Sequence, residues 1–461
     1  MNDENGRLMA GGGCHAHASA DRAETVIWVT GIGVVSPLGV GAELTFDRLV
    51  RGDGAVGELQ LFDPADCRSR LAAEVRELDV AQVAPPEQLD TWSRTDAMAV
   101  MAAREALLQA HLTSDASEDP AVDLIVGGST AGMFETEKLL AEMSKNPESI
   151  EPLKRMLSHP LSATADRMLD TFGLLRDART VCSACSSGAN ALILGASRLL
   201  SGRSSCVLAG GADGLCRLTY VGFNALAALS PAPCRPFSTS RSGLTLGEGA
   251  AFLVLETEAH ARERGVEALA EFRGWAVGSE AYHITHPEPT GETASRVMAS
   301  ALAMAELDPA QVGYLNAHGT ATPLNDAMEI AAIKRCFGPA ASRLMVSSSK
   351  GQIGHTLAAA GAMEAAISVM VVQHGRVPPT VGLGEVDDAC AGVDHVKDGR
   401  RQDVAAAMST SFGFGGSDTA LLFSRPGAFE SKSGFARRRV FVTAAATLGA
   451  EGICGAEEAG V

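Results

Sequence analysis

The chain alternates between short apolar runs and longer segments in which apolar residues recur every three or four positions. The short runs are rich in β-branched residues and end in glycine- or proline-containing turns, as buried strands do. The longer segments have helical spacing. In the first part of the chain, strands are expected at 26–39, 122–129, 179–184, 205–213 and 250–256, and helices at 94–110 and 189–200.

The second part repeats this rhythm, with strands expected at 268–278, 312–320, 344–351 and within 405–425, and helices at 292–306 and 361–373. Strands that are apolar throughout and alternate with helices favour a mostly parallel sheet covered on both faces. The pattern therefore predicts an α/β protein built from two similar halves, residues 25–260 and 261–425.

The two ends of the chain depart from this pattern. Residues 1–24 are polar and rich in Gly and Ala, which predicts a disordered extension. Residues 426–461 are predicted to form a second extension. Within it, 438–455 loosely echoes 26–41, but a lone strand-like run cannot bury its apolar face, so disorder or pairing with a partner is expected.

Composition narrows the class of protein. The chain has 461 residues, of which 46% are hydrophobic and 20% charged, as in an ordinary globular protein. A net charge of −17 argues against nucleic acid as the main partner. The most apolar stretch, 359–373, contains Glu364 and is too short to span a bilayer, and the N-terminus has no apolar signal core. No membrane insertion and a cytoplasmic location are expected.

Cys182 and Cys185 have a C-x-x-C spacing where a predicted strand passes into a helix. A zinc site would need a second ligand pair, and a redox pair would open a thioredoxin-like domain rather than lie in mid-chain. Neither requirement is met, so no metal is expected. A thiol at a helix N-terminus is favoured as a thiolate. Cys185 is therefore either a nucleophile or a small buried apolar residue.

Three further stretches carry candidate chemistry. His318 ends a strand-like run and begins a loop, and Lys350 and His355 flank a glycine-containing turn before a small-residue helix. Residues 411–418 form a Gly-rich loop between two strands, which could present backbone N–H groups to a reacting carbonyl. Each of these stretches alone also has a purely structural explanation.

In this order, the stretches resemble the β-ketoacyl–acyl-carrier-protein synthases, the elongating condensing enzymes of the thiolase superfamily. The matching motifs, spread over residues 25–425, are VTGIGVVSPLG, ACSSG, CRPFSTSRSGLTLGEGAAFLVLE, AYHIT, NAHGTATPLND, SSSKGQIGHTLAAAGAMEA and SFGFGGSD. The resemblance implies a thiolase-like fold, with mixed sheets in five α-β-α-β-α layers. It also implies an acyltransferase that condenses an acyl group with malonyl–acyl carrier protein by decarboxylation, elongating a fatty acid, polyketide or polyene chain.

The resemblance assigns roles to individual residues. Cys185 matches the nucleophile that takes the acyl chain, and His318 and His355 match the histidines that promote decarboxylation and stabilise the enolate. Lys350 matches the lysine near the second histidine. The supporting set is Glu364 as the charge partner of Lys350, Asp326, Glu329, and Phe414 as the aromatic gate, whose backbone N–H with that of Cys185 matches the oxyanion hole. Cys182 is expected to be a buried packing residue.

The resemblance also implies partners. No cofactor is expected, since phosphopantetheine arrives on the acyl carrier protein, which is predicted to dock on Arg94, Arg68 and Arg70. A homodimer, or a heterodimer with a homologous synthase-like subunit, is expected to form by pairing of strand 180–184 across a two-fold axis.

Some positions depart from the family pattern. Ser417–Asp418 stands where Thr–Asn is usual, and 238–243 lacks the usual acidic residues. By resemblance, residues 127–143 are expected to line the acyl pocket and the dimer interface. Glu135 and Glu137 would be unusual in a pocket for a plain fatty chain unless they face solvent. These departures slightly favour a specialised pathway over housekeeping fatty acid synthesis.

Three other functions compete with this reading. A non-catalytic chain-length-factor-like partner would lack the nucleophilic cysteine. A coenzyme A thiolase would carry a C-terminal catalytic cysteine, which Cys390 in "CAG" echoes, but not two histidines in these motifs. An initiating synthase would carry Cys-His-Asn. The Cys-His-His set favours the active elongating enzyme.

Overall fold

The computed structural model describes residues 25–64, 67–112, 121–146 and 151–430, and two short strands at 446–449 and 452–455. The extension expected at 1–24 lies outside the described residues. One compact unit runs from Thr25 to Glu430.

A single mixed sheet runs through this unit. Its first half has the order β1 (Ile27–Ser36), β9 (Gly249–Thr257), β7 (Cys206–Asp213), β5 (Val122–Gly127) and β6 (Leu175–Val181). Its second half has the order β10 (Ala270–Ser279), β17 (Ser417–Ser424), β16 (Ala406–Gly413), β11 (Tyr314–Asn316), β12 (Met345–Ser347) and β14 (Asp394–His395). β1 pairs with β10 through Trp28↔Glu271 and Val29↔Ala270, which joins the two halves.

The sheet is less parallel than the apolar pattern predicted. β5 is parallel to β6 and β7, and β11 is parallel to β12 and β16, whereas β1, β9, β10 and β17 pair with antiparallel neighbours. All ten residues of β1 are buried. An antiparallel strand covered on both faces is as uniformly apolar as a parallel one, so the sequence pattern could not separate them.

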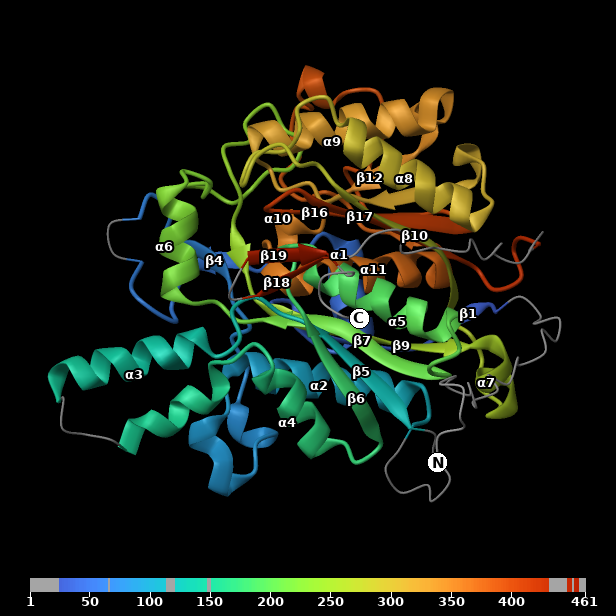
Figure 1. The fold of residues 1–461 in the computed structure, drawn as a ribbon. Coiled ribbons are helices and arrows are strands. Elements are labelled where there is room, and N and C mark those ends of the chain that lie inside the picture. The colour runs from blue at the N-terminus through green and yellow to red at the C-terminus, as the bar shows by residue number, and fades with distance from the viewer. Residues whose placement is uncertain are drawn as a thin grey trace, which may run out of the picture. The chain divides into compact units, whose positions relative to one another are not determined.

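Helices cover both outer faces of the sheet and fill the space between its two halves (Figure 1). α2 (Arg94–Gln109) and α4 (Ala163–Thr171) pack on the first half, and α8 (Glu292–Ala305) with α9 (Pro323–Phe337) covers the second. α5 (Ser187–Leu200) and α11 (Ala360–His374) pack together in the middle layer. The five-layer, thiolase-like arrangement is therefore confirmed.

Smaller elements surround these layers. The remaining helices are α1 (Ala42–Arg51), α3 (Met133–Lys145), α6 (Arg217–Ala225), α7 (Glu258–Glu263) and α10 (Lys350–Ile353), with a 3-10 turn, η6 (Leu357–Ala359), before α11. The short strands are β2 (Gly39–Val40), β3 (Val56–Glu58), β4 (Leu71–Ala73), β8 (Leu246–Gly247), β13 (Arg376–Val377) and β15 (Arg400–Arg401).

The middle-layer helix α11, together with η6 before it, is apolar on nearly every side. The segment Leu357–His374 is long and apolar enough to cross a membrane by length and composition, but 89% of it is buried inside the structure. A helix that is hydrophobic all round suits the centre of a large core.

Small residues allow the two middle helices to approach closely. A Cβ atom on Gly361 would lie 2.8 Å from the Cβ of Ala189, and one on Gly188 would lie 2.8 Å from the carbonyl oxygen of Ala358. Ordinary side chains at these glycines would push α5 away from η6 and α11.

The compact unit extends beyond residue 425, where the sequence analysis ended the second half. The backbone N–H of Gly427 donates to Glu271 Oε1 at 2.9 Å, and Arg273 donates to the carbonyl of Glu430 at 2.8 Å. Residues 426–430 are therefore packed, contrary to the expected disorder. In the remaining tail, β18 (Ala446–Gly449) and β19 (Gly452–Gly455) form an antiparallel pair, and the other residues lie outside the described part.

Removing residues 431–461 should leave the core intact, because the compact unit that contains the core runs from Thr25 to Glu430. We expect the unfolding temperature to change by less than about 2 °C, well under the effect of losing a core interaction. As a matched control, removing 426–461 also deletes the bonds to Glu271 and Arg273 and should lower it. Equal losses in both truncations, measured by thermal circular dichroism, would contradict this boundary.

Candidate active site

Cys185 lies in a tight turn between β6 and α5. Ala184, just before it, has a φ of 52°, in the left-handed region that residues with a Cβ rarely adopt. The turn is held by the hydroxyl of Ser187, which donates to the carbonyl of Ala184 at 2.6 Å and accepts from the backbone N–H of Ser183 at 2.9 Å. This turn places Cys185 at the N-terminus of α5, directly before the N-cap residue Ser186, as predicted.

The Cys185 side chain is buried, and burial raises the pKa of its thiol to about 11. A hydrogen bond from the Phe414 backbone N–H and the positive charge of Lys350 act in the opposite direction but are outweighed. Desolvation therefore opposes the thiolate that the position at the helix N-terminus was expected to favour. The resting group is a thiol.

His318 lies in the loop that follows β11, and two buried carboxylates fix this loop by accepting hydrogen bonds from its backbone. Glu329 accepts the backbone N–H groups of His318 and Gly319, each at 2.8 Å, and the hydroxyl of Thr410 at 2.8 Å. Asp326 accepts the N–H of Ala321 at 3.1 Å and that of Phe237 at 2.8 Å. Burial raises the pKa of Asp326 to about 6 and that of Glu329 to about 7.

His355 lies between α10 and η6, and its tautomer follows from its contacts. The backbone N–H of Leu357 donates to His355 Nδ1 at 3.2 Å, so Nδ1 is the acceptor and Nε2 carries the proton. Lys350 Nζ lies 3.4 Å from His318 Nδ1, which makes Nδ1 the acceptor there as well. Burial and the Lys350 charge lower the pKa of both histidines well below the usual range, so both rings are neutral N–H donors.

Lys350 and Glu364 form a buried ion pair behind the histidines, as the resemblance implied. Both side chains are 2% exposed. Burial raises the pKa of Glu364 to about 7, against the effect of the Lys350 ammonium. Glu364 comes from the second turn of α11, so the middle layer supplies the charge that balances Lys350.

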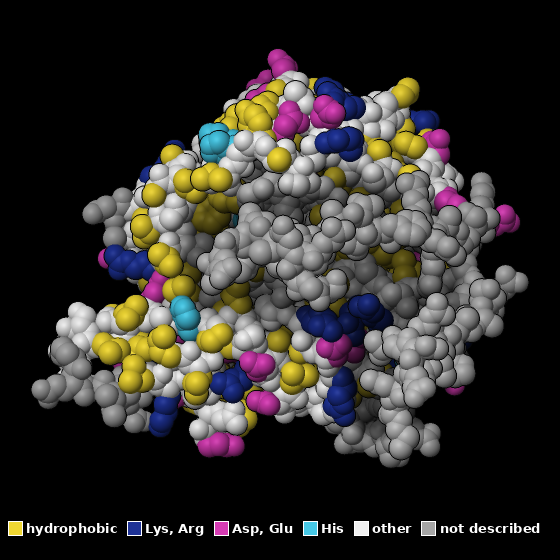
Figure 2. Space-filling model, in the orientation of Figure 1, with side chains coloured by type: hydrophobic (Ala, Val, Ile, Leu, Met, Phe, Trp, Pro, Cys, Tyr) yellow, Lys and Arg dark blue, Asp and Glu magenta, His cyan; other side chains and the backbone are white. Residues whose placement is uncertain are grey.

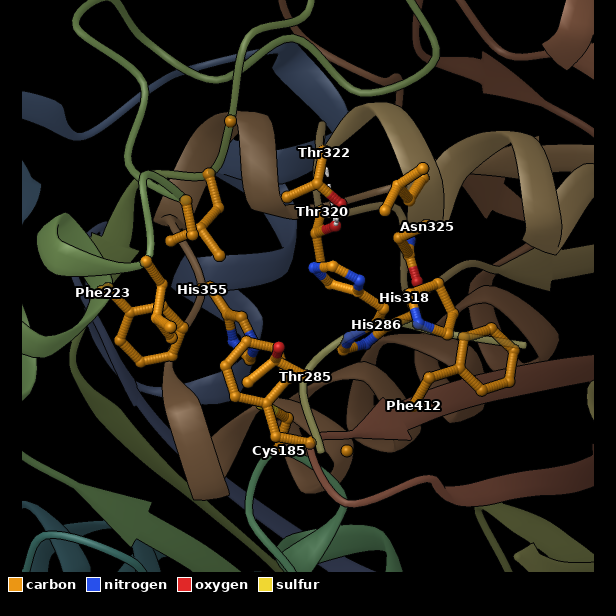
Figure 3. Close-up of a pocket in the computed structure, with 18 of the residues that line it drawn as sticks. Cys185, Phe223, Thr285, His286, His318, Thr320, Thr322, Asn325, His355 and Phe412 are labelled. Carbon is orange, nitrogen blue, oxygen red and sulfur yellow. Dashed lines mark hydrogen bonds between the residues drawn. The ribbon is translucent and has the colours of Figure 1, made fainter. Parts of the chain in front are cut away.

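The cysteine and both histidines line one cavity of about 480 Å³ (Figure 3). The two imidazole rings are perpendicular, with centroids 5.4 Å apart. Phe412 packs edge-on against His318 at 5.6 Å, and Phe414 stacks on Phe223 of α6 at 5.4 Å. The cavity continues to a mouth at exposed Arg68, at Phe223 of α6 and at His283, Thr285, His286 and Pro287.

The cavity does not reach residues 127–143, which were predicted to line the acyl pocket. No residue of 127–143 is among those that line it. Glu135 accepts the backbone N–H of Arg94 at 3.1 Å, and Glu137 accepts those of Arg217 and Leu218 at 2.9 and 2.6 Å. Both glutamates therefore cap the first turns of α2 and α6, and they give no support to a specialised pathway.

The three arginines predicted to bind the carrier protein have different surroundings in the structure. Arg94 is wrong as a docking residue, because its side chain is 14% exposed and forms an ion pair with buried Glu248. Arg68 lines the cavity mouth, and Arg70 is 65% exposed, 3.6 Å from Asp63.

The expectation for Cys182 is also wrong, since Cys182 is exposed rather than packed. β6 ends at Val181, at one edge of the sheet, so the residues that follow it are not covered by a neighbouring strand.

Asp213, at the end of β7, is a site residue that was not predicted from the sequence. This fully buried carboxylate accepts the backbone N–H groups of Ser129 and Thr130 at 2.9 and 2.8 Å, and that of Ala358 at 2.8 Å. It thereby ties the loop after β5 to the segment that follows His355. Its only signal in the sequence was a polar residue ending a buried strand.

Among the described residues, Cys206, Glu256 and His260 lie close enough to share a metal ion. Glu256, however, is already paired with Arg264 at 3.1 Å and with His260 at 2.6 Å. These contacts explain the carboxylate as part of an ion-pair cluster.

The fold and this site define a condensing enzyme of the thiolase superfamily. The N-terminal domain of the β-ketoacyl synthase family matches residues 24–261 and its C-terminal domain matches residues 269–384, so the chain belongs to the β-ketoacyl synthase family. The family predicted from the sequence is thus confirmed.

Relatives come from two kinds of pathway. The chain is 35% identical over 416 residues to the oxytetracycline polyketide putative β-ketoacyl synthase 1 of Streptomyces rimosus, covering 87% of this chain and 97% of the relative. It is 33% identical over 406 residues to the 3-oxoacyl-[acyl-carrier-protein] synthase 2 of Staphylococcus aureus (strain COL), covering 86% and 97%.

Solved structures agree with this placement. The ishigamide ketosynthase/chain length factor has a TM-score of 0.81 at 29% identity, covering 88% of this chain and all of the matched chain. A β-ketoacyl synthase from Burkholderia phymatum STM815 has a TM-score of 0.79 at 33% identity, covering 87% and 99%.

The two cysteines should respond differently to substitution. Cys185→Ala is expected to abolish labelling of the protein by a reactive acyl thioester, because it removes the thiol that lines the cavity. Cys182→Ala should keep full labelling and change the free energy of unfolding by no more than about 0.5 kcal/mol, as for other exposed positions. Mapping the acylated peptide by mass spectrometry checks both. Label that survives in Cys185→Ala but vanishes in Cys182→Ala would reverse the assignment.

Proposed function

We propose that the enzyme elongates a fatty acid, polyketide or polyene chain by decarboxylative condensation of an acyl group on Cys185 with malonyl–acyl carrier protein. The observation that supports this most directly is the convergence of Cys185, His318 and His355 on one cavity, with the Phe414 N–H bonded to the cysteine. The acyl chain and its extender unit would both arrive as phosphopantetheine thioesters.

The first step is thioester exchange. The Cys185 sulfur attacks the acyl carbonyl while the backbone N–H groups of Phe414 and Cys185 stabilise the developing oxyanion. The carrier thiol leaves and takes up the proton that the cysteine releases. The neutral histidines, whose Nε2 atoms carry protons, act as hydrogen-bond donors in this arrangement rather than as bases.

The second step forms the new carbon–carbon bond. The malonyl thioester loses CO2, and its electron pair becomes an enolate that the Nε2–H groups of His318 and His355 stabilise by hydrogen bonds. The enolate carbon attacks the acyl carbonyl on Cys185, and the cysteine leaves as a thiolate. One proton is then taken up to restore the thiol, and the 3-oxoacyl chain leaves on the carrier.

The competing functions lose support. A non-catalytic chain-length-factor-like subunit is not favoured, because the nucleophile and both histidines share the cavity. A thiolase would need Cys390 in the site, but Cys390 is buried in a 3-10 turn and does not line the cavity.

The enzyme is also proposed to work with two protein partners, in the cytoplasm. Relatives of known structure include a ketosynthase bound to its type II polyketide acyl carrier protein and a ketosynthase in complex with its chain length factor. In this chain, β6 lies at one end of the sheet, and exposed apolar side chains gather over α3 and η3 (Glu151–Ser158) (Figure 2). These are Leu140, Leu153, Met156 and Leu157. Both features suit pairing with a second copy or a homologous subunit.

Substitution of the histidines should separate the two chemical steps. His318→Gln and His355→Gln are expected to keep acylation of Cys185 but to slow condensation by about 10²–10³, the effect of removing one oxyanion donor. Intact-mass analysis measures the acyl-enzyme. Condensation is measured by the release of CO2 and the formation of 3-oxoacyl product, which should appear in equal amounts. Wild-type protein that acylates Cys185 but forms no 3-oxoacyl product would defeat the proposed function.

Exposed Arg68, which lines the cavity, and exposed Arg70, two residues further along the chain, should assist carrier binding. Arg68→Ala with Arg70→Ala is expected to raise the KM for acyl–carrier protein about threefold to tenfold at low salt, since exposed ion pairs are individually weak. The KM for a free pantetheine thioester should stay unchanged. Arg94→Ala is the matched control: it should lower the unfolding temperature without a carrier-specific change in KM. A double variant with unaltered carrier kinetics at every salt concentration would exclude docking there.

A further inference from the structure

Asp418 is a buried carboxyl group without a partner. It lies near the start of β17, opposite Phe412 on β16 and Gly278 on β10. The residue is 0% exposed, and neither of its carboxyl oxygens has a hydrogen-bond partner among the described residues. Leaving a buried polar group unpaired is destabilising, so such a group calls for an explanation in function.

The position of Asp418 places it in the wall of the substrate cavity. It lines the same cavity as Cys185 and His318. Directly opposite residues of neighbouring strands share a face of the sheet, so Asp418 lies beside Phe412, whose ring packs on His318. Figure 3 shows Phe412 beside His318, on the side away from His355.

The surroundings of Asp418 determine its protonation. The charged groups that act on it are carboxylates from three segments: Glu280 after β10, Glu288 before α8 and Glu329 in α9. Burial, followed by these three charges, raises the pKa of Asp418 to about 8. Below that pH the side chain is a neutral acid with an O–H to donate. The amide usual at this position in the family could donate at any pH.

We propose that Asp418 is a specificity-determining residue that donates a hydrogen bond to a carbonyl oxygen of the bound substrate other than the reacting thioester. The inference rests on the proposed function, and it identifies the chemical group by which the cavity would select its substrates. Such a carbonyl is present in the amides of the pantetheine arm and in a 3-oxo group of a growing chain. Either would satisfy the unpaired carboxyl, and substrates without that carbonyl would leave it unpaired.

Acylation of Cys185 by four substrates tests this proposal. Saturated and 3-oxo acyl groups are each presented on pantetheine and on a simple alkyl thiol that lacks both amides. Asp418→Leu should lower kcat/KM about fivefold to tenfold, the size of one neutral hydrogen bond, only for substrates with the recognised carbonyl. Loss confined to pantetheine substrates identifies the arm, and loss confined to 3-oxo substrates identifies the chain. An equal effect on all four, or none, overturns the proposal.

The pH dependence provides a second readout, which a structural role would not produce. In the wild type, the preference for the recognised carbonyl should fall as the pH rises through about 8, because Asp418 then ionises. Asp418→Asn should keep the preference at high pH. Glu288→Gln is the matched control, since it removes a neighbouring charge without altering the cavity wall, and it should shift the wild-type profile to lower pH without abolishing the preference.

The two variants keep the test decisive. If Asp418→Leu does not fold, the pH profile of Asp418→Asn against wild type decides alone, and identical profiles overturn the inference. Elongation of a saturated chain by the wild type is measured in parallel. Failure of that reaction would count against the proposed function, whereas normal elongation with variants that show no substrate preference would count only against Asp418.

Discussion

The site depends on one close contact, between the N-terminus of α5 and the segment that leads into α11. Cys185 lies two residues before the start of α5 and His355 two residues before the start of η6, so the distance between these elements sets the distance between nucleophile and hydrogen-bond donor. A Cβ on Gly211 of β7 would lie 2.6 Å from the carbonyl oxygen of Ala358, and Gly188 and Gly361 are equally confined. Asp213 adds a hydrogen bond to the N–H of Ala358 at 2.8 Å. Backbone packing, more than any side-chain contact, brings the chemistry together.

Burial then determines the protonation of the groups that meet there. The same desolvation that raises the pKa of Cys185 lowers the pKa of His318 and His355. All three are therefore neutral, and the ammonium of Lys350 beside them is balanced by Glu364. A site of this kind is well suited to stabilising charge that appears only during the reaction, because its donors are already oriented and little water competes with them.

Much of this could be predicted from the sequence because the relevant signals are local. The helical spacing after Cys185 predicts α5, and the ordered motifs identify the two histidines and the lysine. The predictions that failed concern contacts between residues far apart in the chain. Arg94 looked exposed, yet its partner Glu248 follows 154 residues later. Asp213 joins two loops that no spacing connects, and Glu135 and Glu137 cap helices to which they do not belong. The pKa of Cys185 is raised because its side chain is buried. The spacing of apolar residues in the following helix does not show how deeply that side chain is buried.

The carboxylate of Glu364 has a consequence for how the chain is made. Leu357–His374 emerges from the ribosome before the sheet strands β16 and β17 that will cover it, and by length and composition it resembles a membrane-spanning helix. Glu364 lies near the middle of that segment, where a charged residue opposes insertion by on the order of 3 kcal/mol. The residue that neutralises Lys350 in the finished enzyme thus also makes this helix a poor candidate for insertion into a membrane.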